Sequence, residues 1–82
     1  MSLDELKNTT IVIGAKQVRK AISQGMTDKV FIADDAEPHV VEPIKELCRQ
    51  NNIAIQFIDT KAALGRYCGI EVGSATAAVL ND

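Results

Sequence analysis

Short apolar segments rich in β-branched residues alternate with amphipathic segments along most of the chain, and this alternation restricts the fold more than any other feature. The expected strands cover residues 10–13, 29–33, 53–58 and 74–80. The expected helices cover residues 2–8, 15–24, 38–50 and 61–67. Strands and helices in this order are typical of an α/β fold, in which helices cover a buried sheet.

The chain is long enough for one domain with one core. It has 82 residues, of which 46% are hydrophobic, and it contains no linker or internal repeat. We therefore expect a single domain over residues 1–82, built as a three-layer αβα sandwich with a mixed sheet of about four strands. The spacing of apolar residues does not determine the strand order.

Two residues are expected to shape the helices locally. Thr60 precedes a helical segment that runs to Tyr67, so its hydroxyl is expected to cap that helix. Pro43 falls inside the segment that begins near Pro38. Because proline lacks a backbone N–H group, Pro43 is expected to kink or restart that helix.

The sequence carries no targeting, membrane or metal-binding signal. Its first residues are acidic and no long apolar run follows, so a cytoplasmic location is expected. No apolar stretch approaches the roughly 18 residues of a membrane helix, so no membrane association is expected. Cys48 and Cys68 fit no metal-ligand spacing and are expected to be buried, reduced thiols, without metal or cofactor. No heptad repeat requires self-association, so we expect a monomer.

Charge is distributed unevenly, although the formal net charge of the chain is only −2. Residues 1–30 carry five basic and three acidic groups, whereas residues 31–60 carry two basic and six acidic groups. A chain with this balance does not attract nucleic acid as a whole, but basic residues flank two glycine-containing segments. Such a local basic patch favours selective binding with few phosphate contacts.

The first glycine-containing segment, residues 14–20, opens the second expected helix. One face of that helix carries Lys16, Gln17 and Lys20, and the opposite face is apolar. Lysines above the unpaired N–H groups of a helix start can hold a phosphate, and lysine and glutamine can both read base edges. The alternative interpretation is an ordinary solvated helix face.

The second glycine-containing segment, residues 64–73, places Ile70 and Val72 on either side of Glu71. In an extended loop these two apolar side chains point the same way, and glycine lets the backbone approach another molecule closely. Such a loop can cover an unstacked RNA base. The alternative interpretation is the start of a strand, with Ile70 and Val72 in the core and Glu71 in water.

Three motifs follow one another in a specific order and spacing. They are Ile-Gly-Ala-Lys-Gln-Val-Arg-Lys-Ala at residues 13–21, Val-Phe-Ile-Ala-Asp-Asp-Ala-Glu-Pro at residues 30–38, and Leu-Gly-Arg-Tyr-Cys-Gly-Ile-Glu-Val-Gly-Ser-Ala at residues 64–75. With these motifs the chain resembles the kink-turn-binding ribosomal-protein family, often called the L-seven-Ae family. The resemblance is closest to the small bacterial members of the YbxF type.

The resemblance implies an αβα sandwich that binds kink-turns, which are sharply bent RNA elements with a short bulge beside tandem sheared G·A pairs. The implied partner is a structured RNA with a kink-turn, in ribosomal RNA or in a riboswitch. The implied RNA contacts are Gly14, Lys16, Gln17 and Lys20 on the helix, and Ile70, Glu71 and Val72 on the loop. Archaeal and eukaryotic relatives usually have Asn-Glu in place of Lys16-Gln17, so affinity or sequence preference is expected to differ. Binding of this kind selects the bent RNA from an extended ensemble and involves no catalysis.

Two other functions remain as alternatives. An enzyme would need a nucleophile and a base, but His39 and Cys48 fall on opposite faces of one expected helix, so no enzymatic activity is predicted. A protein-interaction module would present its acidic middle third to a basic partner. The acidic residues in question are Asp34, Asp35, Glu37, Glu42 and Glu46. The simpler interpretation of these residues is that they are solvated carboxylates near a helix start.

Overall fold

The computed structural model of the chain describes residues 10–70 and 72–80. In chain order the elements are β1 (Ile11–Ile13), α2 (Ala15–Ser23), β2 (Thr27–Ala33), α3 (Pro38–Gln50), β3 (Ala54–Ile58), α4 (Lys61–Tyr67) and β4 (Thr76–Leu80). The helix expected over residues 2–8 lies outside the described residues, as does Glu71.

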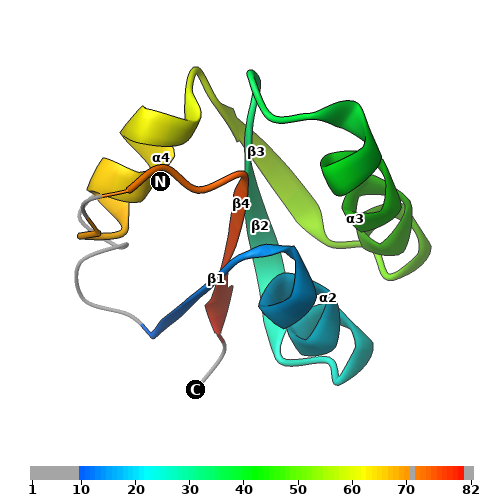
Figure 1. Cartoon of the computed structure of the whole chain (residues 1–82). Helices are drawn as coiled ribbons and strands as arrows, with labels where there is room; N and C mark the ends of the chain where they lie inside the picture. Colours follow the sequence, from blue (N-terminus) through cyan, green and yellow to red (C-terminus); the bar gives the residue numbers. More distant parts are fainter. Residues whose placement is uncertain (1–9, 71, 81–82) are drawn as a thin grey trace.

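The four strands form one mixed sheet in the order β1-β4-β2-β3 (Figure 1). β2 and β3 are parallel, whereas β4 lies between β1 and β2 and runs antiparallel to both. Ala78 of β4 pairs with Val12 on one side and with Val30 on the other. The predicted mixed sheet is therefore confirmed.

Helices cover both faces of this sheet, as Figure 1 shows. α2 and α3 pack against each other on one face, and α4 is the described helix on the other face. The core is formed by side chains such as Val18 and Ile22 of α2, Ile44 of α3 and Leu64 of α4, each at most 1% exposed. Burial of one such side chain contributes about 1.5–3 kcal/mol. The predicted three-layer αβα sandwich is confirmed.

The start of α4 and the end of α3 both follow local signals in the sequence. The Thr60 hydroxyl accepts a hydrogen bond from the backbone N–H of Ala63 at 3.0 Å, so the predicted cap of α4 is confirmed. After the end of α3, Asn52 adopts a φ of 57°, a left-handed conformation that asparagine tolerates better than most residues. Asn52 therefore helps to turn the chain from α3 toward β3.

Pro43 does not interrupt α3, which is continuous from Pro38 to Gln50. The expectation that the helix restarts at Pro43 is therefore wrong. A proline removes the hydrogen bond to the carbonyl four residues earlier and crowds that carbonyl, but the buried Val41 and Ile44 on either side pack the helix onto the sheet and offset this cost. α3 is the longest described helix with 13 residues, and no described helix is long and apolar enough to cross a membrane.

All four strands begin at another residue than expected, β1 and β3 by one residue and β2 and β4 by two, and both β2 and β4 begin with a threonine whose side chain bonds to a distant strand. β2 begins at Thr27, where the hydroxyl donates to the Val79 carbonyl at 2.6 Å. β4 begins at Thr76, whose hydroxyl donates to the Phe31 carbonyl at 2.9 Å. Both bonds join residues far apart in the sequence, so local patterns do not reveal them.

Candidate nucleic-acid interface

Gly14 connects the end of β1 to the start of α2. Its φ of 97° lies in a region that side-chain-bearing residues rarely adopt, so glycine is required there. Its N–H donates to the Thr76 carbonyl at 3.1 Å, and its carbonyl accepts the N–H of Val18 at 2.9 Å. The start of α2 is thereby fixed to the start of β4.

The two faces of α2 separate as the sequence predicts. Its buried residues are Val18, Ala21 and Ile22. Lys16, Gln17 and Lys20 are exposed, and within residues 10–70 and 72–80 neither lysine takes part in an ion pair. Gly14 gives the helix start no side-chain cap, so backbone N–H groups of the first turn face outward beside these lysines. An anion is favoured at such a helix start.

The loop that follows α4 is held directly against that helix. The N–H of Ile70 donates to the Gly65 carbonyl at 3.0 Å, and the N–H of Ser74 donates to the Lys61 carbonyl at 3.1 Å. A Cβ atom at Gly65 would overlap the carbonyl oxygen of Val72. A Cβ atom at Gly73 would lie only 3.1 Å from the Cβ atom of Lys61. The two glycines therefore allow a contact between loop and helix backbone that other residues would prevent.

This loop is not the start of a strand, because β4 begins only at Thr76. Val72 is 71% exposed, and Ile70 is half-buried. The interpretation that places Val72 in the core is therefore wrong. Glu71 lies outside the described residues, so its predicted role stays a prediction. Val72 therefore presents an apolar side chain to solvent next to the helix that carries the loop.

The start of α2 and this loop border the same end of the sheet, where β1 ends and β4 begins (Figure 1). The pairing of Ile13 with Ala77 and the bond from Gly14 to Thr76 join the two segments. We name this region the α2–loop surface. It comprises Gly14, Lys16, Gln17, Lys20, Ile70 and Val72. The polar residues lie on α2 and the apolar ones on the loop, so a ligand that touches both groups must span the junction.

Sequence reasoning missed two features beside this surface. The Asp35 carboxylate accepts the N–H of Lys61 at 2.7 Å and so binds the first turn of α4, the helix that carries the loop. Gln17 and Lys20 also border a hollow of about 200 Å³, whose lining includes Met26, a residue that is 41% exposed. The first feature joins residues 26 positions apart and leaves no local signal. The second had a signal, because Met26 is an apolar residue directly after Gly25.

The thiols and the histidine are not assembled into a nucleophilic site. His39 is exposed, and its Nε2 atom lies 3.2 Å from a Glu37 carboxylate oxygen. Cys48 lies on the same helix but on its buried face, and it is fully buried. Cys68 is half-buried at the end of α4, so its expected full burial is wrong. Burial raises the pKa of both thiols and so disfavours the reactive thiolate. No metal-binding group of three His, Cys, Asp or Glu residues occurs among the described residues.

The acidic residues of the middle third are partly neutralised. Glu42 pairs with Lys45 at 3.6 Å, and Glu46 pairs with Arg49 at 2.6 Å. Arg49 lowers the pKa of Glu46, mainly through its side-chain hydrogen bond. Asp34 is exposed and takes part in no ion pair within the described ranges.

Fold and surface together define a small α/β protein with an exposed basic helix face and an exposed apolar loop at one end of its sheet. The chain belongs to the Ribosomal protein L7Ae/L30e/S12e/Gadd45 family, whose sequence model matches residues 3–82. This confirms the resemblance drawn from the three motifs. The family is non-catalytic, which confirms the prediction that the chain is not an enzyme.

Individual relatives cover most of the chain. The RNA-binding protein TTE2299 of Caldanaerobacter subterraneus is 55% identical over 67 residues, which are 82% of each protein. The large ribosomal subunit protein eL8 of Halobacterium salinarum is 38% identical over 81 residues, which cover 96% of this chain and 68% of that protein. The structure of the Giardia lamblia 15.5kD RNA binding protein matches with a TM-score of 0.87 at 28% identity, and the match covers 98% of this chain and 68% of that chain.

Proposed function

We propose that this chain binds RNA through the α2–loop surface and that its target contains a kink-turn. The family and the names of the relatives, an RNA-binding protein and a ribosomal subunit protein, support RNA as the ligand. The surface offers cations and amides on one element and apolar side chains on another. A matching ligand presents phosphates and base edges to α2 and an unstacked base to the loop. A bent RNA with a bulge has both.

The exposed side chain of Val72 is the observation that carries the proposal. This residue is 71% exposed, and its backbone packs directly on Gly65 of α4. Because the Val72 backbone lies against α4, its side chain can be presented with a reduced entropic cost of ordering on binding. Val72 and the half-buried Ile70 can thus cover the face of an extruded base.

α2 supplies the polar half of the proposed interface. Lys16 and Lys20 are one helical turn apart and exposed, so both ammonium groups can reach the same RNA groove. Lysine donates to the O6 and N7 atoms of guanine, which the sheared G·A pairs present. Gln17 stands between the lysines and can both donate and accept a hydrogen bond. The side chains of α2 thereby supply sequence preference as well as charge.

The proposed effect on the RNA is a shift of population. Free RNA samples extended and bent forms, and a protein that binds only the bent form increases its share by its differential affinity. This effect suits a role in the assembly of a folded RNA, in ribosomal RNA or in a riboswitch.

Binding to two matched RNAs tests the proposal. One RNA contains a kink-turn, and in the other Watson–Crick pairs replace the tandem G·A pairs. Calorimetry at fixed salt is expected to detect binding to the first RNA and much weaker binding to the second. The affinity for the first is expected to fall with salt, with a slope of about −0.7 to −0.9 per phosphate contact. Equal affinity for the two RNAs would contradict kink-turn recognition.

Two exposed apolar residues provide a variant and its control. Val72→Ser removes the exposed apolar side chain of the loop and is expected to weaken kink-turn binding about tenfold, because burial of one valine side chain contributes about 1.5–3 kcal/mol. Phe57→Ser changes a residue that is 49% exposed on β3, outside the α2–loop surface, and is expected to leave the affinity unchanged. If the two variants lose affinity equally, Val72 has no specific role.

A further inference from the structure

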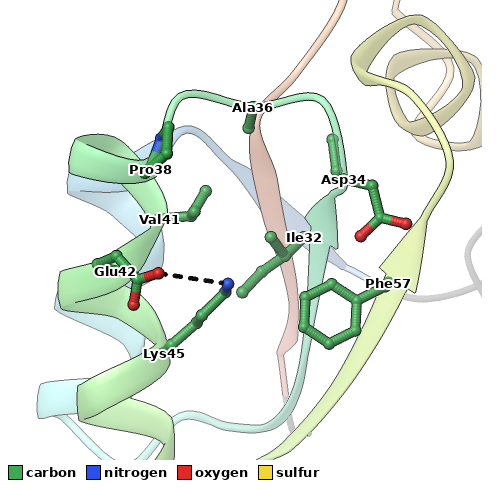
Figure 2. A pocket seen from close by; sticks show the side chains of 9 residues that line it. Ile32, Asp34, Ala36, Pro38, Val41, Glu42, Lys45 and Phe57 are labelled. Atoms are coloured by element: carbon green, nitrogen blue, oxygen red, sulfur yellow. Dashed lines mark ion pairs between the residues drawn. The ribbon is translucent and has the colours of Figure 1, made fainter.

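A hollow of about 110 Å³ lies between α3 and the edge strand β3, separate from the α2–loop surface (Figure 2). Its floor is apolar and its rim is charged. The apolar residues that matter here are Ile32, Val41 and Phe57, and the charged ones are Asp34, Glu42 and Lys45. Figure 2 shows Lys45 extending from α3 toward the sheet, with Asp34 and Phe57 on the opposite side of the hollow.

Phe57 is exposed although it is a large aromatic residue. Its exposed fraction is 49%, and it lies on β3 at one edge of the sheet. Aromatic residues are enriched in protein interfaces because one ring supplies a large contact area at low entropic cost. An exposed phenyl ring beside an apolar hollow therefore favours a protein ligand.

Lys45 indicates which chemical group the hollow holds well. Its ammonium nitrogen lies 3.6 Å from a carboxylate oxygen of Glu42 and 5.4 Å from the centroid of the Phe57 ring. A cation between a carboxylate and an aromatic face is favoured by both. The chain's own lysine thus occupies a position that a cation from another molecule can take.

The remaining charge selects a cationic ligand over a nucleic acid. Asp34 is exposed at the rim and has no ion-pair partner among the residues that the structure describes. With Asp34 and Glu42 against Lys45, the rim carries one more negative than positive group. It therefore repels phosphate and attracts a positively charged side chain.

We propose that this hollow binds an arginine side chain from a basic segment of a protein partner. Its volume of about 110 Å³ is well below the roughly 300–1,000 Å³ of small-molecule sites and fits one side chain. A guanidinium group is planar, so it can stack on Phe57 while its N–H groups donate to Asp34 and Glu42. An ammonium group is a compact point charge with no flat face to stack on the ring. The aliphatic stem packs on the apolar floor.

An NMR titration of the full chain with matched peptides tests this inference. One capped glycine-serine peptide carries three arginines, and the second carries citrulline at the same positions, which keeps the shape and removes the charge. The arginine peptide is expected to shift the amide signals of Asp34, Val41 and Phe57, and the citrulline peptide to leave them unchanged. A kink-turn RNA is also expected to leave these signals unchanged. Equal shifts with citrulline, or shifts at these residues with the RNA, would overturn the proposal.

Two acidic residues on α3 allow binding in the hollow to be distinguished from general electrostatic attraction. Glu42→Gln removes a rim carboxylate and is expected to raise the Kd of the arginine peptide about fivefold. Glu46→Gln makes the same charge change outside the hollow, where Glu46 pairs with Arg49, and is expected to leave that Kd nearly unchanged. Equal losses in the two variants would overturn the proposal.

Two basic residues on α3 give a test whose expected result is tighter binding, which a misfolded variant would not show. Lys45→Met keeps the aliphatic stem and removes the competing ammonium group, so the arginine peptide is expected to bind about threefold more tightly. Arg49→Met makes the same charge change away from the hollow and is expected to have little effect. If both variants bind more tightly to the same extent, or neither does, Lys45 does not occupy the arginine position and the proposal fails.

Discussion

α2 and α3 pack side by side on one face of the sheet, yet their charged groups are arranged differently (Figure 1). On α3, Lys45 and Arg49 each pair with a glutamate three residues earlier. On α2, none of the cations is paired within the described part of the chain. The cations of α2 are Lys16, Arg19 and Lys20. The net charge of −2 does not reveal this difference: the cations of α2 can pair with an external anion, whereas those of α3 are already paired with glutamates.

This difference teaches where a polyanion can bind. A phosphate that approaches α3 must separate each cation from a carboxylate, whereas at α2 it displaces only water and small ions. Exposed ion pairs contribute little to folding stability, about 0.2–1 kcal/mol each. Their main effect on α3 is thus to make that helix a poor binding site for anions.

The largest expected effect comes from Gly65→Ala, which tests the loop half of the α2–loop surface. A Cβ atom at this position would overlap the Val72 carbonyl, so the loop has to leave α4. We expect the free energy of unfolding to fall by about 3 kcal/mol, because overpacking costs about 1–3 kcal/mol or more, and kink-turn binding to be lost. Urea unfolding and calorimetry measure the two losses. Ala62→Gly on the exposed side of the same helix is the control, with an expected cost of about 1 kcal/mol. Wild-type stability and RNA affinity in Gly65→Ala would refute the role of this close contact.

A smaller effect is expected from single cations on the two helices. Lys20→Ala on α2 is expected to weaken kink-turn binding by about 1–3 kcal/mol, the contribution of a good base contact. Arg49→Ala removes the same charge from α3 and is expected to change the affinity little, because Arg49 already pairs with Glu46. Calorimetry with the kink-turn RNA measures both. Comparable losses would show that only the overall charge matters and would remove the distinction between the helices.

Pro43→Ala is expected to stabilise the protein by about 1 kcal/mol. The substitution restores a backbone N–H inside α3, and this gain exceeds the entropy that proline removes from the unfolded chain. Pro38→Ala is the matched control, since proline at the first position of a helix interrupts no hydrogen bond. Urea unfolding measures both variants. A Pro43→Ala variant no more stable than the wild type would mean that α3 carries no penalty for its internal proline.

The smallest expected effect is the dependence of stability on pH that arises from Glu46. Arg49 lowers the pKa of this carboxyl below its ordinary value of 4.5 in the folded state, so the unfolded chain takes up its proton first on acidification. The stability contributed by the pair is therefore complete above the ordinary pKa and is lost as the pH falls through the lowered one. Urea midpoints of the wild type and Glu46→Gln are expected to converge as the pH falls from the ordinary pKa of 4.5 through the lowered one. A constant difference between them would contradict the lowered pKa.

Features with local causes could be predicted from the sequence. The two faces of α2 follow from the spacing of Val18, Ala21 and Ile22, and the Thr60 cap follows from one residue at a helix start. The spacing of apolar segments likewise indicates a sheet between helices, because each strand and helix must bury an apolar side. These features need only neighbours along the chain.

Features that depend on distant residues could not be predicted in this way. Ile70 and Val72 fit a strand start and an exposed loop equally well, and only the contact with Gly65 distinguishes the two. The bond from Lys61 to Asp35 and the position of β4 inside the sheet also join distant parts of the chain. Periodicity carries no information about such pairs.

The central position of β4 has a consequence for the order in which the protein matures during synthesis. β1 and β2 each pair with β4 and not with each other, so β1 has no neighbouring described strand until residues 76–80 have left the ribosome. The carbonyl of Thr76 that receives the Gly14 N–H also arrives only then. A nascent chain can therefore pair β2 with β3 early, but it completes its four-stranded sheet and the junction between α2 and the loop only in the step that adds β4.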